Sequence, residues 1–140
     1  MIIHTHRDLV DAIGSQCSLS GRIAAKFRSD LDLHEVGDFW LDYSKIGMDR
    51  GLKAKERLPA SQVYDLRLSD LHADPLNVIA DIYNHFDLPF DDTLAAQLQA
   101  RIADEPKQQH GEHEYDIADF GLTAERIHST FADYRQRFGV

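Results

Sequence analysis

Ile2-Ile3-His4-Thr5-His6-Arg7-Asp8 is the stretch that decides the fold, because a short β-prone run meets a helix start within it. Asp8 is a preferred N-cap residue, and Asp11 stands three residues later in an imperfect capping-box position. The residues that follow carry apolar side chains at helical spacing, at Val10, Ile13 and Cys17. We therefore expect a strand over residues 2–6 that leads directly into a first helix.

The rest of the chain alternates helix and strand signals. Asp32 and Glu35 form a capping-box pattern, and Pro59 stops the helix that they open. Asp74-Pro75 combines an N-cap with proline at the first helical position. The elements expected after residue 30 are a helix over about 33–57, a strand over 63–68, a helix from 75, and helices over 92–103 and 123–138.

This order of elements is typical of an α/β crossover with parallel strands. Parallel sheets are normally larger than two strands and buried on both faces. We therefore expect an α/β fold in partial form, mostly helical with about two parallel strands. Residues 1–140 would be a single partial domain, the back part of a larger one. The alternative is a small helical domain with a two-stranded ribbon.

Composition excludes several classes of function. The 140 residues include 24 acidic side chains against 15 lysines and arginines, a formal net charge of -9. This balance disfavours non-specific attraction to nucleic acid or anionic lipid, and no nucleic-acid-binding motif is present. No apolar run approaches the ~20 residues of a membrane-spanning helix. Cys17 is the single cysteine, so no intramolecular disulfide can form and we expect a cytoplasmic location.

A local basic site could still bind an anion where the first strand meets the first helix. Ligands of open α/β sheets bind at the carboxyl ends of strands, and helix N-termini offer free N–H groups. Arg7 would add a forked cation suited to phosphate, and Ser15 lies two turns along the helix, ~10 Å away. The alternative is that Arg7 pairs with Asp8 or Asp11 and that Ser15 is a solvated helix residue.

These residues belong to a longer pattern that resembles sulfotransferases that use 3′-phosphoadenosine 5′-phosphosulfate (PAPS), in particular their bacterial branch. The pattern follows in order along essentially the whole chain. Its residues are His6-Arg7-Asp8 with Ser15, Trp40-Leu41-Asp42-Tyr43, Tyr64 to Leu71, Asp74-Pro75, Ile82-Tyr83 with Phe86, Leu88-Pro89, His110-Gly111, His113, Tyr115, Asp119 to Leu122, and Phe131 to Gly139.

The resemblance implies a P-loop-NTPase-like three-layer fold, with PAPS as co-substrate and transfer of a sulfuryl group to a hydroxyl or amine acceptor. It assigns the 3′-phosphate of the nucleotide to Arg7 and Ser15, and it extends the nucleotide site to Lys107 beside His110-Gly111. Leu9 and Leu68 depart from the family pattern, because many relatives carry proline and an aromatic residue at these two positions.

Relatives also carry an earlier strand, a phosphosulfate-binding loop and usually a catalytic base before the His-Arg-Asp segment. None of these lies in the 140 residues, so we assign no catalytic residue and expect the chain to be inactive alone. The alternative function is a noncatalytic remnant or a protein-interaction module without nucleotide binding. An incomplete sheet would also leave the strand over 2–6 with an unpaired edge, which predicts a possible homo-oligomer.

The sequence also contains eight histidines and an aromatic stripe in the second expected helix. His4 and His6 alternate onto one face of the first strand, but zinc normally needs three or four converging ligands, so we expect no metal site. One helical face carries Val36, Phe39, Trp40, Tyr43 and Ile46, and its Trp40/Tyr43 stripe should form core or the wall of an acceptor pocket. An incomplete domain would leave some apolar side chains, such as Phe39, partly bare.

Overall fold

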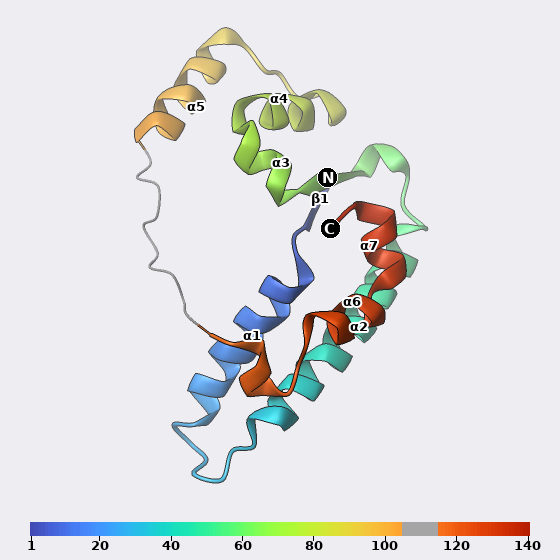
Figure 1. The fold of residues 1–140 in the computed structure, drawn as a ribbon. Helices are drawn as coiled ribbons and strands as arrows, with labels where there is room; N and C mark the ends of the chain where they lie inside the picture. The colour runs from blue at the N-terminus through green and yellow to red at the C-terminus, as the bar shows by residue number, and fades with distance from the viewer. Residues whose placement is uncertain (105–114) are drawn as a thin grey trace. The chain divides into compact units, whose positions relative to one another are not determined.

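The computed structural model describes residues 1–104 and 115–140, and Figure 1 labels most of their helices and one of their strands. Strand β1 (Ile2–His6) is followed by helices α1 (Leu9–Ala24) and α2 (Leu33–Lys55). After the short helix η1 (Ala60–Gln62) come β2 (Val63–Arg67), α3 (Leu68–Ala73), α4 (Pro75–His85) and α5 (Asp92–Asp104). The described chain closes with η2 (Ile117–Phe120), α6 (Ala124–Thr130) and α7 (Ala132–Phe138).

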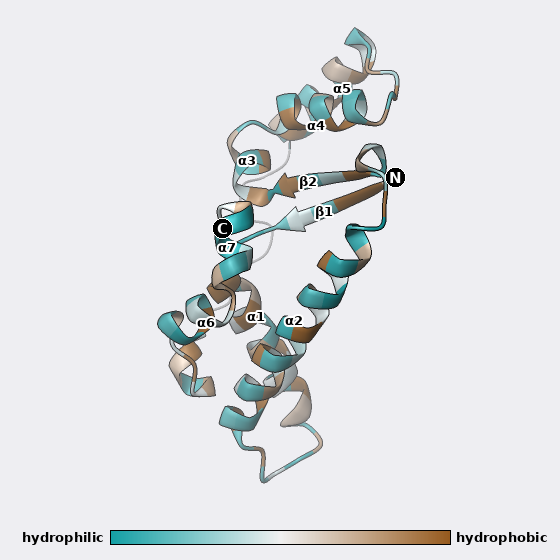
Figure 2. Cartoon of the chain, turned by 90° about the vertical axis from the view of Figure 1, so that its right-hand side faces the viewer, coloured by the Kyte–Doolittle hydropathy of each residue, from teal (hydrophilic) through white to brown (hydrophobic). Residues whose placement is uncertain are grey.

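Strands β1 and β2 lie side by side and run in the same direction (Figure 2). Their register pairs Ile2 with Val63 at one end and His6 with Arg67 at the other. A parallel pair needs a long crossover connection, and α1 and α2 provide it. The expected mostly helical chain with two parallel strands is thereby confirmed.

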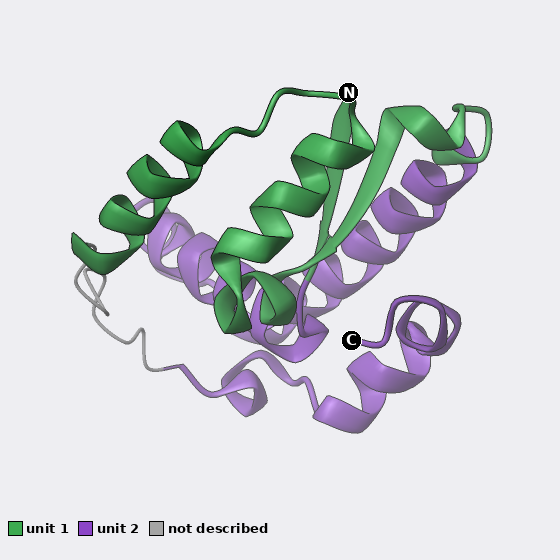
Figure 3. Ribbon diagram, turned by 90° about the horizontal axis from the view of Figure 1, so that it is seen from above, with its two compact units in different colours: residues 1–6, 55–112 green, residues 7–54, 113–140 purple. Residues whose placement is uncertain are grey.

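The chain divides into two compact units, coloured separately in Figure 3. Unit 1 comprises Met1–His6 and the described part of Lys55–Glu112, and so contains both strands with α3, α4 and α5. Among the described residues of this unit, Leu66 on β2 and Ile82 on α4 are the buried apolar side chains. Unit 2 comprises Arg7–Ala54 and the described part of His113–Val140.

Unit 2 holds the main hydrophobic core. This core brings together residues of α1, α2, η2, α6 and α7, elements from both ends of the chain. Its buried members are Leu9, Ile13, Cys17, Leu41, Phe120, Leu122, Ile127, Phe131 and Tyr134. Burial of this apolar area is the main stabilising contribution to the unit.

Four helices, α1, α2, α4 and α5, begin where the sequence predicts, and an aspartate side chain accepts a backbone hydrogen bond at the start of each. At α5 the Leu94 N–H donates to Asp91 at 2.8 Å. The Asp8 carboxylate accepts a hydrogen bond from the Asp11 backbone N–H at 3.0 Å, and Asp74 accepts one from Asn77 at 3.3 Å. Asp32 accepts instead from the N–H of His34 at 2.9 Å, one residue before the capping-box position. Each contact satisfies a backbone donor that the first turn of a helix leaves free.

The prediction of one helix over 123–138 is wrong, because α6 and α7 are separated at Phe131. The hydroxyls of Ser129 and Thr130 both donate to the backbone carbonyl of Arg126, at 3.0 and 2.8 Å. Such side-chain bonds to a helical carbonyl bend a helix. Phe131 then adopts φ -114° and ψ 25° and places its ring, only 2% exposed, in the core.

Three residues of the aromatic face of α2 lie outside the core, so for them the wall of an acceptor pocket or a bare apolar face stays the prediction. Phe39, Tyr43 and Ile46 are 57%, 60% and 51% exposed. Val36 and Trp40 pack against the core, as expected. The buried line of α2 runs instead through Gly37 and Leu41, one position away from the predicted face.

No helix in the described ranges combines the length and the apolar character that a membrane crossing requires.

Candidate functional site

The residues that the sequence assigns to phosphate binding lie at the start of α1 and along it. Arg7 precedes the N-cap Asp8 directly, and its side chain is exposed. In the parts of the chain that the structure describes, no carboxylate lies within ion-pairing distance of the Arg7 guanidinium. The alternative, in which Asp8 or Asp11 neutralises Arg7, is therefore not observed.

The tip of α1 already carries negative charge. The Asp8 side chain caps the helix through the Asp11 N–H, and Asp11 adds a second carboxylate in the first turn. A carboxylate at this position interacts favourably with the helix dipole and repels a further anion. A phosphate would therefore lie beside the guanidinium of Arg7 and along the helix, rather than on its axis.

Ser15 is half-buried on α1, seven residues after Asp8. Seven residues are close to two turns, so Ser15 lies on the same side of the helix as Asp8 and ~10 Å further along. Arg7 and Ser15 thus belong to one rigid segment, which is what binding of a single extended ligand would require. The structure shows this placement, and the assignment of both residues to a phosphate stays a prediction.

Tyr115 contributes to this segment although the sequence did not assign it to the site. Its hydroxyl donates a hydrogen bond to the backbone carbonyl of Asp11 at 2.9 Å. In an α-helix that carbonyl also accepts from the N–H four residues on, which belongs to Ser15. The Tyr115 ring lies where a Cβ on Gly14 would be, so the two residues can pack only because residue 14 lacks a side chain. A glycine inside a helical pattern was the one sequence signal for this close approach.

The pKa of Tyr115 depends on its burial and on the charged residues near it. Burial raises the pKa of the Tyr115 hydroxyl, the Asp11 carboxylate raises it further, and the positive charge of Arg7 acts in the opposite direction. The phenol therefore stays protonated at neutral pH and keeps its hydrogen bond to Asp11. Arg7, Asp11 and Tyr115 form one electrostatic neighbourhood beside Ser15.

The third residue of the predicted site, Lys107, lies outside the described residues, as do His110 and His113. The described site therefore consists of Arg7, Ser15 and the supporting pair Gly14 and Tyr115.

Comparison with known proteins connects this segment to a family. Residues 1–92 match the family model described as the sulfotransferase family, a range that includes β1, both candidate phosphate-binding residues and β2. No curated protein matches the chain.

Two crystal structures of mycobacterial sulfotransferases are similar to the chain. For sulfotransferase STF9 from Mycobacterium avium the TM-score is 0.81 and the identity 28%, over 96% of this chain and 35% of that one. For sulfotransferase STF1 from Mycobacterium tuberculosis H37Rv the TM-score is 0.70 and the identity 30%, over 95% of this chain and 33% of that one.

The chain therefore spans about a third of the length of these two enzymes. The likeness confirms the expected fold class, a partial P-loop-NTPase-like sulfotransferase fold with two parallel strands in this chain. The family model covers more than half of the 140 residues, and the match runs through the segment that carries Arg7 and Ser15. The chain belongs to the sulfotransferase family.

Proposed function

We propose that this chain forms the nucleotide-binding part of a PAPS-dependent sulfotransferase, with Arg7 and Ser15 holding the 3′-phosphate. The observation that carries the proposal is the exposed guanidinium of Arg7, which has no ion-pair partner in the described residues although Asp8 and Asp11 are close in sequence. The chain belongs to the sulfotransferase family. An arginine at this position without an ion-pair partner in the described residues is suited to bind the phosphate of an anionic nucleotide.

The chemistry of the two residues fits a phosphate. A guanidinium offers paired N–H donors to two phosphate oxygens, and a serine hydroxyl donates to a third. Tyr115 would act as a positioning residue, because its hydrogen bond to Asp11 and its packing on Gly14 fix the turn of α1 that carries Ser15. The acidic residues of the first turn oppose binding, so we expect weak affinity from this segment by itself.

The proposed reaction transfers SO₃ from the phosphate of PAPS to a hydroxyl or amine, and the acceptor loses a proton to a base. Arg7 and Ser15 would hold a phosphate that takes no part in this bond exchange. Such contacts bind the ground state and the transition state equally, and they do not accelerate the chemical step. No leaving-group cation and no catalytic base is assigned among the 140 residues, so we expect the isolated chain to show no sulfuryl transfer. The lone thiol of Cys17 favours a cytoplasmic location.

Calorimetry with adenosine 3′,5′-bisphosphate tests the binding proposal, and adenosine 5′-monophosphate serves as the matched ligand without a 3′-phosphate. We expect the bisphosphate to bind more tightly than the monophosphate. Arg7→Ala should weaken the bisphosphate about tenfold or more, because a charge-assisted hydrogen bond contributes roughly 1.5–3 kcal/mol. Arg22→Ala is the control, since Arg22 is an exposed arginine in the last turn of the same helix.

The outcomes separate the alternatives. Absence of binding at millimolar bisphosphate would reject nucleotide binding by this chain and favour a protein-interaction module. Equal loss in Arg7→Ala and Arg22→Ala would reject the residue assignment and indicate general charge attraction. Mass spectrometry across a panel of acceptors tests for sulfuryl transfer by the purified chain. Its detection would reject the expectation that the isolated chain is inactive.

A further inference from the structure

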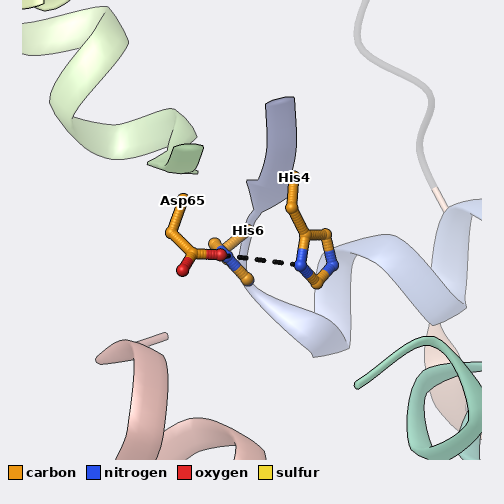
Figure 4. A group of neighbouring side chains, drawn as sticks. All are labelled: His4, His6 and Asp65. Carbon is orange, nitrogen blue, oxygen red and sulfur yellow. Dashed lines mark hydrogen bonds and ion pairs between the residues drawn. The ribbon is translucent and has the colours of Figure 1, made fainter. Parts of the chain in front are cut away.

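Two histidines and an aspartate converge on one face of the two-stranded sheet in unit 1. His4 and His6 are two residues apart on β1 and so project from the same face, and Asp65 on β2 is the direct partner of His4. Figure 4 shows the three side chains pointing toward one another. One nitrogen of each histidine and a carboxylate oxygen of Asp65 all lie within 4.8 Å of one another.

The distances from Asp65 Oδ1 to the two histidine nitrogens are close to the distances between ligand atoms of a metal ion. His6 Nε2 lies 2.9 Å from Asp65 Oδ1, and His4 Nδ1 lies 3.6 Å from the same oxygen. Ligand atoms bound at 2.0–2.2 Å to a tetrahedral zinc ion are roughly 3.3–3.6 Å from one another. Small side-chain movements would therefore place all three donor atoms around one ion.

We propose that His4, His6 and Asp65 bind a divalent first-row transition-metal ion such as Zn²⁺. Two imidazoles and one carboxylate are a donor set that this class of ion prefers, and three protein ligands leave a fourth position open. The ligands come from both strands, so the ion would cross-link β1 to β2. The sequence showed His4 and His6 on one face, and it is the parallel register that supplies the third ligand.

Lys55 is the competitor of the metal at this site. Its ammonium forms an ion pair with Asp65 Oδ1, the oxygen closest to both histidines. The ammonium thus neutralises the carboxylate that the ion needs, and two cations at one oxygen repel each other. Metal binding would displace Lys55, so the affinity is set by a competition that can be shifted by mutation.

The test uses the complete 140-residue chain without an affinity tag. Co²⁺ is the spectroscopic probe, because a four-coordinate site gives intense visible bands that the hydrated ion lacks, and Zn²⁺ calorimetry gives the stoichiometry. We expect one ion per chain, with His4→Gln and Asp65→Asn weakening binding at least tenfold. Lys55→Met should tighten binding several-fold, because it removes the competing charge. His72→Gln, which changes an exposed histidine of α3 in the same unit, should have no effect.

The Lys55 variant keeps the test decisive if the ligand variants unfold. A structural ion pair alone predicts that Lys55→Met leaves metal binding unchanged, whereas the metal site requires an increase. Unchanged binding in Lys55→Met, full binding in folded His4→Gln, or absence of the cobalt bands would overturn the proposal. Because the site uses neither Arg7 nor Ser15, this result is independent of nucleotide binding.

Discussion

At the scale of single residues, Cys17 shows how burial determines side-chain chemistry. Its side chain is fully buried in the core of unit 2, among residues such as Ile13 and Phe131. Burial disfavours the charged thiolate and raises the pKa of Cys17 to about 11, from an ordinary value of 9.0. The thiol therefore contributes stability that is complete below the pKa of the unfolded chain and is lost as the pH rises through about 11.

The raised pKa predicts an inert thiol. At pH 8 the native chain should react with a disulfide reagent at least about a hundredfold more slowly than the unfolded chain. The reason is that a pKa raised by about two units lowers the population of the reactive thiolate about a hundredfold. The measurement is the rate of thiol modification with and without denaturant. Gln16→Cys in a Cys17→Ser background is the control, because Gln16 is exposed on the same helix and its thiol should react quickly. Equal native rates for the two positions would contradict the buried placement of Cys17.

At the scale of elements, the packing of α2 on η2 depends on the absence of one side chain. Gly37 is buried in α2, and a Cβ there would lie on the backbone carbonyl oxygen of Phe120. Two other glycines of the same helix, Gly47 and Gly51, have open space where a side chain would be. Glycine lowers the stability of a helix relative to alanine. The close contact at Gly37 requires this loss, whereas no contact requires it at Gly47 and Gly51.

Substitution by alanine should reveal this difference. Gly37→Ala should lower the free energy of unfolding by about 1–3 kcal/mol, because the new methyl group forces α2 away from η2. Gly47→Ala should raise it by about 0.5–1 kcal/mol, since it restricts the unfolded chain and adds helix propensity without a clash. Chemical denaturation of both variants gives the two values. A neutral Gly37→Ala would mean that α2 and η2 are further apart than the structure shows.

The elements that the sequence predicted correctly are those that depend on local interactions. The caps at Asp8 and Asp74 each join a side chain to a backbone N–H three residues away, so a short stretch of sequence contains the whole interaction. The break at Phe131 was missed, because apolar periodicity through 123–138 gave no sign that two hydroxyls would bind the carbonyl of Arg126. The core face of α2 was missed because it depends on Phe120, far along the chain.

The same distinction applies to the candidate sites. Arg7 and Ser15 could be placed on one segment from the sequence, because helix geometry relates them. Tyr115 binds the carbonyl of Asp11 across 104 positions, and His6 meets Asp65 across 59, so no local pattern connects either pair. Their partners become visible only with the tertiary packing of unit 2 and the register of the two strands.

At the scale of the whole molecule, the sheet is the feature with the largest consequence for behaviour in solution. β1 pairs with β2 along one edge, and no other strand of the described chain joins the sheet. Ile2 and Ile3 on β1 are 46% and 41% exposed. The edge of β1 that faces away from β2 carries no third strand in the described chain, and exposed apolar side chains on such an outer strand favour pairing with another chain.

We therefore expect the purified chain to associate through the outer edge of β1, the edge that faces away from β2, as its concentration rises. Sedimentation velocity over a concentration series should show a growing dimer or larger species, and the melting temperature should rise with concentration, because association stabilises the folded form by mass action. Ile3→Lys should suppress the association, since a lysine on an edge strand opposes pairing with a second strand. Ile23→Lys introduces the same charge at a comparably exposed position on α1 and should leave the association intact. A monomer at every concentration, or equal suppression by both lysines, would show that the edge of β1 does not direct self-association.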